Sequence, residues 1–295
     1  MDDAPLEQYA PHATLLGELP IRRLLPVRQR RLVGPWCFLD RYGPLTFAGG
    51  KPMDVAPHPH AGLQTVTWLL DGEVVHHDSL GGEGLIRPGA LSLMTAGSGI
   101  AHAEESPSEN SGKLNGVQLW VALPDAHRHT AAHYEHHAEM PQLELPGCRI
   151  NLIAGEMAGQ VSPAQAYSPI LGASITVDRG REVELPLQGA FEHAVVLLTG
   201  DLSVEGQELA RDTLYYAGTA RRQIGMRSRE GARVLLIGGA PFGETILMWW
   251  NFVARTPEEI AAVRLDWEEH RRFGDVKVYR GPRISAPEFM HLRRS

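Results

Sequence analysis

The chain has 295 residues, of which 43% are hydrophobic, and 28 basic against 35 acidic side chains give a formal net charge of −7. This length allows two domains with cores of their own, and the composition is that of a globular protein rather than a disordered one. No apolar run reaches the roughly 18 residues of a membrane-spanning helix, and the acidic balance argues against direct nucleic-acid binding. We therefore expect neither a membrane nor a nucleic acid as a partner.

Short strand-like runs separated by Gly and Pro fill most of the chain. They are rich in Val, Leu, Ile, Thr and aromatic residues, with turn residues at their ends. They cover residues 63–72, 91–99, 116–124, 171–178, 194–207, 212–218 and 232–239. The sequence therefore predicts an all-β fold.

Residues 255–270 form the one segment that predicts a helix. Thr256 suits the N-cap, Pro257 the first helical position, and Glu259 the last place of a capping box. An apolar face follows at Ile260, Val263 and Trp267. We expect a single helix near the C-terminal end.

A weak internal repeat divides the chain. Residues 69–74 (LLDGEV) are similar to residues 197–202 (LLTGDL), and each copy reads as a strand, a Gly turn and a returning strand. When the two turn glycines are aligned, Pro186 and Gln188 of the second copy stand where the first copy has two histidines. The repeat predicts two similar β domains, only the first of which has a polar site.

The polar stretch 124–147 is the expected boundary, which gives domains at 1–140 and 141–295. This stretch is rich in histidine and lacks a carboxylate at a matching spacing. We interpret its histidines as surface residues rather than metal ligands: His127, His129, His133, His136 and His137.

Two pairs of polar residues at i and i+2 mark the first half of the chain: His58 with His60, and His102 with Glu104. Alternate residues of a strand share one face, so each pair points to one side. We expect the pairs to converge across the interior of a small barrel. Three imidazoles and a carboxylate suit Fe(II), Mn, Ni, Co, Zn or Cu. The residues alone leave a second interpretation open, in which they are polar side chains that share a strand face.

Several longer motifs resemble one family. In order along the chain they are HPHAGLQTVTWLLDGE, HHDSLG, RPG, MTAGSGIAHAE, GVQLWVALP and WWNFV. Their order is similar to that of the pirin family of bicupins over nearly the whole chain. The resemblance implies two cupin (jelly-roll-like) β-barrel domains packed together, with iron, as Fe(II), only in the N-terminal one. It assigns the iron ligands to His58, His60, His102 and Glu104.

The chain departs from the wider cupin pattern at Gln64, where many relatives have a Glu. Because the pirin carboxylate comes from the later motif, we expect the metal to be kept and Gln64 to be a neighbour that tunes the pocket. Gln118, on one strand face with Trp120, is a candidate for the pocket wall. Glu105 is one residue out of phase with Glu104 and should face solvent.

His76 and His77 lie in a third motif of the resemblance, and alternation places one of them inside. The inner histidine either orients a metal ligand or receives a substrate proton. Alternatively, its hydrogen bonds only hold the hairpin together. His76 joins Gln64 and Gln118 as a candidate substrate contact.

The resemblance implies a quercetin 2,3-dioxygenase, which cleaves a flavonol with O2 and releases CO. Glu104 would then be catalytic, as a ligand that also accepts a proton. The alternative is a non-enzymatic, redox-responsive iron protein that binds a transcription factor or a metabolic enzyme. Two cysteines are too few for a disulfide framework, and the first residues lack the order of a secretory signal, so we expect a cytoplasmic protein, and we predict a monomer.

Overall fold

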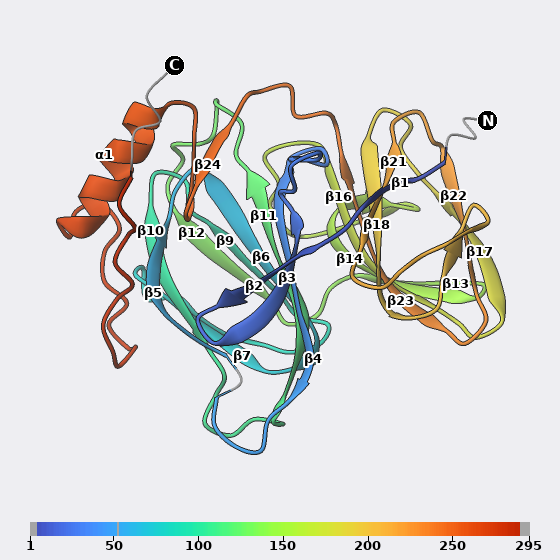
Figure 1. Cartoon of the computed structure of the whole chain (residues 1–295), viewed down its shortest axis with the longest axis horizontal. Coiled ribbons are helices and arrows are strands. Elements are labelled where there is room, and N and C mark those ends of the chain that lie inside the picture. Colours follow the sequence, from blue (N-terminus) through green and yellow to red (C-terminus); the bar gives the residue numbers. More distant parts are fainter. Residues whose placement is uncertain (1–4, 52, 290–295) are drawn as a thin grey trace.

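Two β domains lie side by side in the computed structural model, which describes residues 5–51 and 53–289 (Figure 1). Each domain has one large and one small antiparallel sheet, and the two sheets of a domain pack face to face rather than closing into a barrel. The single α-helix of the described residues lies at the outer side of the first domain. The predicted fold class, two cupin domains of β structure with a C-terminal helix, is confirmed.

The first domain contains a seven-stranded and a four-stranded sheet. Across the larger sheet the strands are β12 (His133–His137), β9 (Leu91–Thr95), β6 (Leu63–Gly72), β11 (Lys113–Ala122), β4 (Trp36–Thr46), β3 (Leu19–Leu25) and β2 (His12–Leu16). Across the smaller sheet they are β5 (Asp54–His60), β10 (Ile100–Glu105), β7 (Val74–Asp78) and β8 (Glu83–Ile86). Both polar pairs of the sequence therefore lie in the smaller sheet.

The second domain contains an eight-stranded and a four-stranded sheet. The larger sheet runs β1 (Glu7–Tyr9), β21 (Leu214–Gly218), β18 (Glu192–Gly200), β23 (Ala232–Gly239), β16 (Ile170–Val177), β14 (Cys148–Met157) and β13 (Gln142–Leu145), and β15 (Gln160–Val161) pairs with β14. The smaller one runs β17 (Arg181–Pro186), β22 (Gln223–Ser228), β19 (Ser203–Val204) and β20 (Gln207–Glu208). The change from one domain's sheets to the other's falls between β12 and β13.

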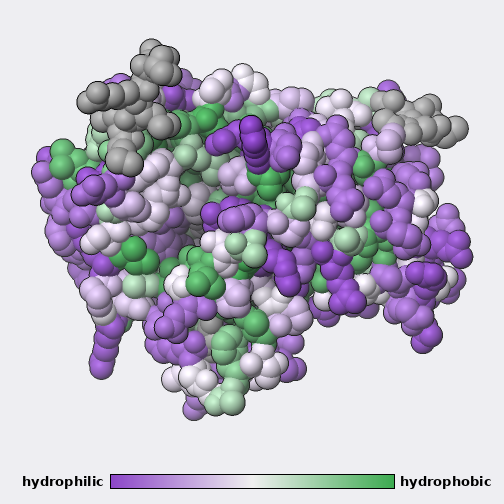
Figure 2. Space-filling view, in the orientation of Figure 1, coloured by the Kyte–Doolittle hydropathy of each residue, from purple (hydrophilic) through white to green (hydrophobic). Residues whose placement is uncertain are grey.

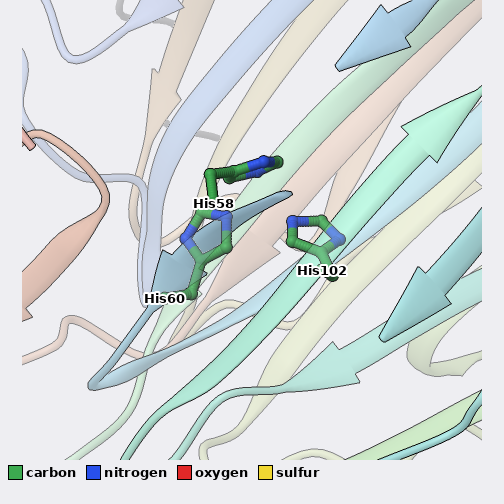
Figure 3. A group of neighbouring side chains, drawn as sticks. All are labelled: His58, His60 and His102. Carbon is green, nitrogen blue, oxygen red and sulfur yellow. The ribbon is translucent and has the colours of Figure 1, made fainter. Parts of the chain in front are cut away.

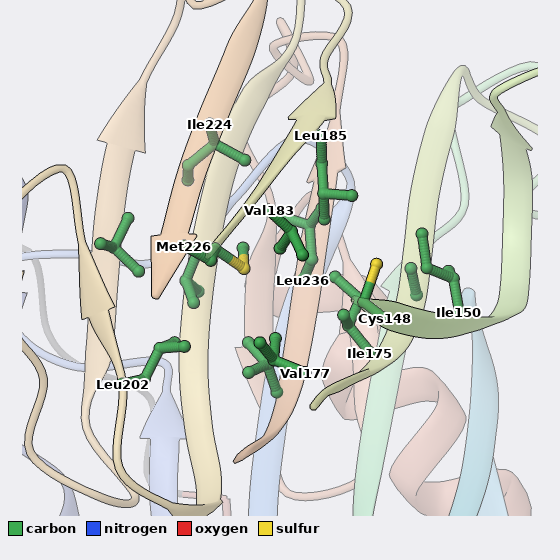
Figure 4. Close-up of a cluster of buried hydrophobic side chains, with 14 of the residues drawn as sticks. Cys148, Ile150, Ile175, Val177, Val183, Leu185, Leu202, Ile224, Met226 and Leu236 are labelled. Atoms are coloured by element: carbon green, nitrogen blue, oxygen red, sulfur yellow. The ribbon is translucent and has the colours of Figure 1, made fainter. Parts of the chain in front are cut away.

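Apolar side chains fill the interior of the second domain (Figure 4). Members of this core come from both of its sheets and include Ile150, Val177, Leu185, Met226 and Leu236. Among the described residues, no group of His, Cys, Asp or Glu that could hold a metal lies in this domain. The candidate metal-holding groups of the described residues lie in the first domain.

The internal repeat is visible in the backbone. Gly72 and Gly200 have φ values of 92° and 86°. A Cβ on Gly72 would lie 2.2 Å from the carbonyl oxygen of Lys113, and one on Gly200 would lie 1.9 Å from that of Gly231. Both turns therefore need glycine, for the same two reasons: a left-handed backbone and a close strand crossing.

A hydrophobic cluster joins the two domains through their large sheets. It contains Val66 and Leu119 of the first domain and Val196 and Leu235 of the second. At its centre the buried Trp36 donates its indole N–H to the carbonyl oxygens of two strands of the second domain, at 3.0 Å each. The domains form one continuous apolar contact, which fixes their relative orientation.

Both ends of the described chain cross over to the other domain. Near the start, β1 pairs with β21 of the second domain. After the second domain, β24 (Leu247–Trp249), β25 (Phe252–Ala254) and α1 (Pro257–Glu268) return to the small sheet of the first domain. The amide of Val253 donates to the carbonyl oxygen of Ala61 at 3.0 Å. The C-terminal segment is therefore part of the first domain's wall.

The helix has the predicted N-terminus. Thr256 is the N-cap, and its hydroxyl accepts the amide N–H of Glu259 at 3.2 Å. The buried residues of the helix are the predicted apolar face, which packs on the small sheet. With 12 residues α1 is too short to cross a membrane, and no helix among the described residues is long and apolar enough to do so.

Candidate metal centre

The two histidines of the first pair and the histidine of the second lie on neighbouring strands. β5 and β10 are antiparallel, with His58 directly opposite His102, and His60 follows two residues later on the same face. The sequence led us to expect that the two pairs converge across the interior. Instead, they lie side by side on neighbouring strands of one sheet. Adjacent strands lie only about 5 Å apart, so this register alone brings the imidazoles together.

Three imidazoles form a compact, buried cluster (Figure 3). One nitrogen of each of His58, His60 and His102 lies within 4.8 Å of the others. The ring centroids of His58 and His102 are 4.3 Å apart, and those of His60 and His102 are 5.0 Å apart. None of the three side chains is more than 7% exposed.

The Nδ1 atoms of the three rings already have partners. That of His58 is 2.9 Å from the carbonyl oxygen of Ala56, and that of His60 is 3.1 Å from the carbonyl oxygen of Asn251. The Nδ1 of His102 is 3.3 Å from the Nδ1 of His76. The Nε2 of His102 is buried and has no hydrogen-bond partner among the described residues. Each ring is therefore held from behind and leaves its Nε2 for a metal, the usual arrangement of histidine ligands.

The electrostatics of the cluster favour neutral imidazoles. Burial lowers the pKa of His58 to about 4. Burial, together with the charge of His58, lowers the pKa of His60 and of His102 well below the usual value. A neutral imidazole is the form that binds a metal, so the donor set fits a divalent transition metal.

Glu104 stands slightly apart from this cluster. A bulge between His102 and Glu104 shifts the register of β10. The Glu104 carboxylate belongs to a second group with His102 and His76, in which the ligand atoms again lie within 4.8 Å of one another. Its Oε1 accepts the hydroxyl of Thr67 at 2.8 Å, and burial raises its pKa. The two groups share His102.

A cavity of about 330 Å³ opens beside the cluster. All four predicted ligands line it. Its other walls are mainly apolar and aromatic, with a few polar groups, and include Ile21, Phe38, Met53, Val55, Trp120 and Trp250, with Arg23, Asp40, Tyr42, Gln118 and Asn251. Its volume and lining are those of a small-molecule site.

Comparison with known proteins identifies the chain. The family model described as Pirin matches residues 18–121, and that of the Pirin C-terminal cupin domain matches residues 172–274. A Pseudomonas aeruginosa protein, named provisionally as a quercetin 2,3-dioxygenase, is 46% identical over 93% of this chain and 87% of its own length. The chain belongs to the pirin family. A pirin-like protein of Caulobacter vibrioides is 37% identical over 87% of this chain and 90% of its own.

A solved pirin-type structure has the same fold throughout. The crystal structure of a quercetin 2,3-dioxygenase from Acinetobacter baumannii superposes with a TM-score of 0.95 at 39% identity. The match covers 98% of this chain and 97% of the other. The whole two-domain arrangement is therefore shared, including the C-terminal segment that closes the first domain.

Tyr42 is a residue of this pirin site that the sequence did not single out. It is 1% exposed, it lines the cavity, and its hydroxyl has no hydrogen-bond partner among the described residues. Burial, and then the charge of Glu104, raise the pKa of Tyr42, so the phenol stays protonated. No motif marks this tyrosine, because only the strand register brings it to the site.

The other sequence candidates lie in different places. Gln118 lines the cavity, and its Oε1 is 2.9 Å from the Thr67 hydroxyl, which also contacts Glu104. The buried amide of Gln64 donates to the Thr95 hydroxyl at 2.9 Å and to the carbonyl oxygen of Gln165 at 3.0 Å. Gln64 is not among the residues that line the cavity.

Other residues considered in the sequence lie outside the cavity. Glu105 turns away from the cluster and pairs with Lys51. The predicted connector implied that the histidines at 133–137 lie in a loop. They lie instead in β12, an edge strand of the large sheet. Half-buried polar side chains are common on such an edge.

Cys37 is buried, and burial raises its pKa to about 12, so its thiol is not activated.

Proposed function

We propose that this chain is a metal-dependent quercetin 2,3-dioxygenase, which cleaves a flavonol with O2 and releases CO. The observation that carries the proposal is the cluster of three buried imidazoles beside an apolar cavity. The names of the relatives in Pseudomonas and Acinetobacter support the substrate class. We assign the metal ligands to His58, His60, His102 and Glu104.

Fe(II) is the metal we propose. Three nitrogens and one oxygen suit Fe(II), and also Mn, Ni, Co, Zn and Cu, whereas structural zinc sites are closed by four ligands. A bound divalent metal would supply positive charge and open coordination positions that bring a deprotonated hydroxyl and dioxygen together. The protein's part is to orient the substrate, exclude water and take up a proton.

Glu104 is the group that we propose to accept the substrate's hydroxyl proton. The Thr67 hydroxyl holds Oε1, so the second carboxylate oxygen is left for a metal or for the substrate. The Oε1 of Gln118 lies 2.9 Å from the same Thr67 hydroxyl, so the two oxygens share its one proton. Tyr42, which also lines the cavity, carries a protonated hydroxyl that has no hydrogen-bond partner in the described part of the chain and can donate to an oxygen of the substrate. The site therefore has both an acceptor and a donor for a polyhydroxylated ligand.

Stacked aromatic rings form one wall of the site. Phe38 and Trp120 stack at 4.0 Å with an angle of 11° between their planes, and Trp120 meets His60 edge-on at 5.0 Å. The guanidinium of Arg23 lies 4.5 Å from the Phe38 ring and makes two hydrogen bonds to Asp40. A flat aromatic substrate fits such a wall, and the apolar surface excludes water from the reacting atoms.

Two observations favour catalysis over the regulatory alternative. The cavity beside the cluster leaves space for a ligand rather than being filled by bulky side chains. On the face seen in Figure 2, hydrophilic side chains cover most of both domains and hydrophobic ones occur in small groups. A contiguous apolar patch of several hundred Å² is what marks a docking surface, and this face does not present one. We further propose a cytoplasmic location, which the two buried free cysteines support, and a monomer.

The decisive experiment is flavonol consumption by protein loaded anaerobically with Fe(II). Loss of quercetin absorbance and release of CO are followed after air is admitted, with metal-free protein and His58→Ala as controls. We expect metal-dependent loss and stoichiometric CO. Protein that holds its iron but consumes no flavonol would refute the enzyme and move the assignment to the redox-responsive binding protein.

A further inference from the structure

A fourth buried histidine, next to the three of the metal cluster, contacts one of them. His76 lies on β7, opposite Glu104 of β10, and is 1% exposed. Its Nδ1 is 3.3 Å from the Nδ1 of His102, and its Nε2 is 3.2 Å from Oδ2 of Asp78, which is 4% exposed. The three side chains form a continuous chain of hydrogen bonds that begins at a proposed metal ligand.

Only one placement of the protons satisfies this chain when His102 binds a metal. The Nε2 of His102 must be free of hydrogen, so the proton of its neutral ring lies on Nδ1. That N–H then donates to the Nδ1 of His76, which must be bare. The proton of the His76 ring therefore lies on Nε2 and donates to the Asp78 carboxylate. A carboxylate in this position determines the tautomer of both rings.

Asp78 is itself fixed as a carboxylate. Its Oδ1 accepts the amide N–H groups of Leu80 and Gly82, each at 2.8 Å. Burial opposes its ionisation, but the hydrogen bonds from His76, Gly82 and Leu80 prevail and lower its pKa. A Cβ on Gly82 would lie only 2.3 Å from Oδ2, so the backbone closes tightly around the carboxylate. The acceptor at the end of the chain cannot easily move away.

The orientation of the His76 ring is also set by packing. Its ring stacks on Tyr134 at 4.0 Å, with an angle of 7° between the planes. The Tyr134 hydroxyl lies 3.2 Å from that of Ser92, which holds the tyrosine in turn. An ordinary polar core residue does not need this combination of a stacked ring, an ionised partner and a neighbouring ligand.

We propose that Asp78 and His76 are positioning residues that fix the tautomer and orientation of His102 and so set the affinity of the metal site. This inference rests on the proposed metal centre, since it assigns a role toward one of its ligands. His76 is then neither a metal ligand nor a substrate contact. It acts through His102, as outer partners of histidine ligands do elsewhere, where their loss costs about 10–100-fold in metal affinity.

The test is the dissociation constant of Zn²⁺, measured by competition with a chelator of known affinity. We expect His76→Phe to weaken binding by about 10–100-fold. His77→Phe is the matched control, because His77 is the next residue of β7, points away from the cluster, and pairs with Glu83 and Glu105. Its affinity should stay within about twofold of the wild type, since it touches no ligand. Thermal midpoints of the metal-free proteins check that each variant is folded.

A conservative variant separates positioning from folding. In His76→Gln the side-chain carbonyl can accept the His102 N–H and the amide can donate to Asp78, so much of the lost affinity should return. In Asp78→Asn the amide donates instead of accepting, which favours the wrong tautomer of His76, so affinity should fall. In Zn-loaded wild type, ¹⁵N spectra should show hydrogen on Nδ1 of His102 and on Nε2 of His76.

The outcomes distinguish the two proposals. Wild-type protein that fails to bind one Zn²⁺ per chain would overturn the metal centre itself. A wild type that binds Zn²⁺, with His76→Phe binding as tightly, would overturn only the positioning role. An equal loss in His77→Phe would also overturn it, since the effect would then belong to the hairpin. Should His76→Phe not fold, Asp78→Asn and the ¹⁵N spectra decide by the same criteria.

Discussion

His193 offers a test of the structure that is independent of the metal. The residue is fully buried beside the Phe191 ring and the backbone of Gly238, and neither ring nitrogen has a hydrogen-bond partner among the described residues. Burial lowers its pKa to about 4. Because the unfolded chain binds this proton more readily, folding stability must fall as the pH drops below about 6.5, the pKa of a free imidazole.

The magnitude follows from the two pKa values. At pH 5 an unfolded histidine is almost fully protonated, whereas the folded one stays about nine-tenths neutral. The free energy of unfolding should therefore fall by about 2 kcal/mol between pH 7 and pH 5 on account of His193 alone. The full loss, about 3 kcal/mol, is reached below about pH 3, where both the folded and the unfolded histidine are protonated and the term is constant.

His193→Leu removes this term, because it replaces an imidazole that makes no hydrogen bonds to any described residue with an apolar side chain. Urea unfolding of the metal-free wild type and variant is measured at pH 7 and pH 5. The buried histidines of the metal cluster contribute equally to both proteins and cancel, since they lie in the other domain. His12→Gln, which removes an exposed imidazole, is the control. A wild type and a His193→Leu variant with the same pH dependence would refute the reasoning.

Three further predictions concern the proposed site. His58→Ala should lose most of the bound metal while the fold survives, which elemental analysis and circular dichroism check together; stoichiometric metal in the variant would contradict the ligand assignment. Glu104→Gln should keep its metal but lose flavonol turnover by about 10²–10⁴-fold if the carboxylate acts as the base, as kinetics of iron-loaded protein measure; metal lost along with activity would mark it as chiefly a ligand. Tyr42→Phe should bind metal normally but lower kcat/KM for quercetin by about 2–10-fold, the value of one hydrogen bond; an unchanged kcat/KM would exclude the phenol as a donor.

The alternation of residues made the core of the site predictable. Residues at i and i+2 of a strand must share a face, so His58 and His60 could be paired without any structure. The turn glycines Gly72 and Gly200 could be matched for a similar reason, because a left-handed turn restricts the sequence more than a core does. Strand-like composition sufficed for the all-β class, whereas the cupin form of the two domains was implied by the family resemblance. These features are local, and local rules find them.

The remaining parts of the site depend on contacts between distant segments. Nothing in the sequence around Tyr42 shows that it lines the cavity, and nothing around Asn251 shows that it contacts His60. The first depends on strand register and the second on the return of the C-terminal segment. The direction in which His76 points could not be decided for a related reason. Parity fixes that His76 and His77 face opposite sides, but only the pairing of β7 with β10 shows which side is the interior.

That returning segment ties the metal site to the whole chain. The carbonyl of Asn251 holds the Nδ1 of His60, and the amide of Ile284 donates to the carbonyl oxygen of Pro57 at 2.8 Å, one residue before the first histidine. Trp250 adds a wall of the cavity. These contacts orient a proposed metal ligand, so docking of the segment should strengthen metal binding. By thermodynamic linkage, metal binding must then stabilise the docked segment by the same free energy. The second domain then has a physical role in the site of the first. Through the shared cluster around Trp36 it holds the chain in the position from which the segment returns to close the site.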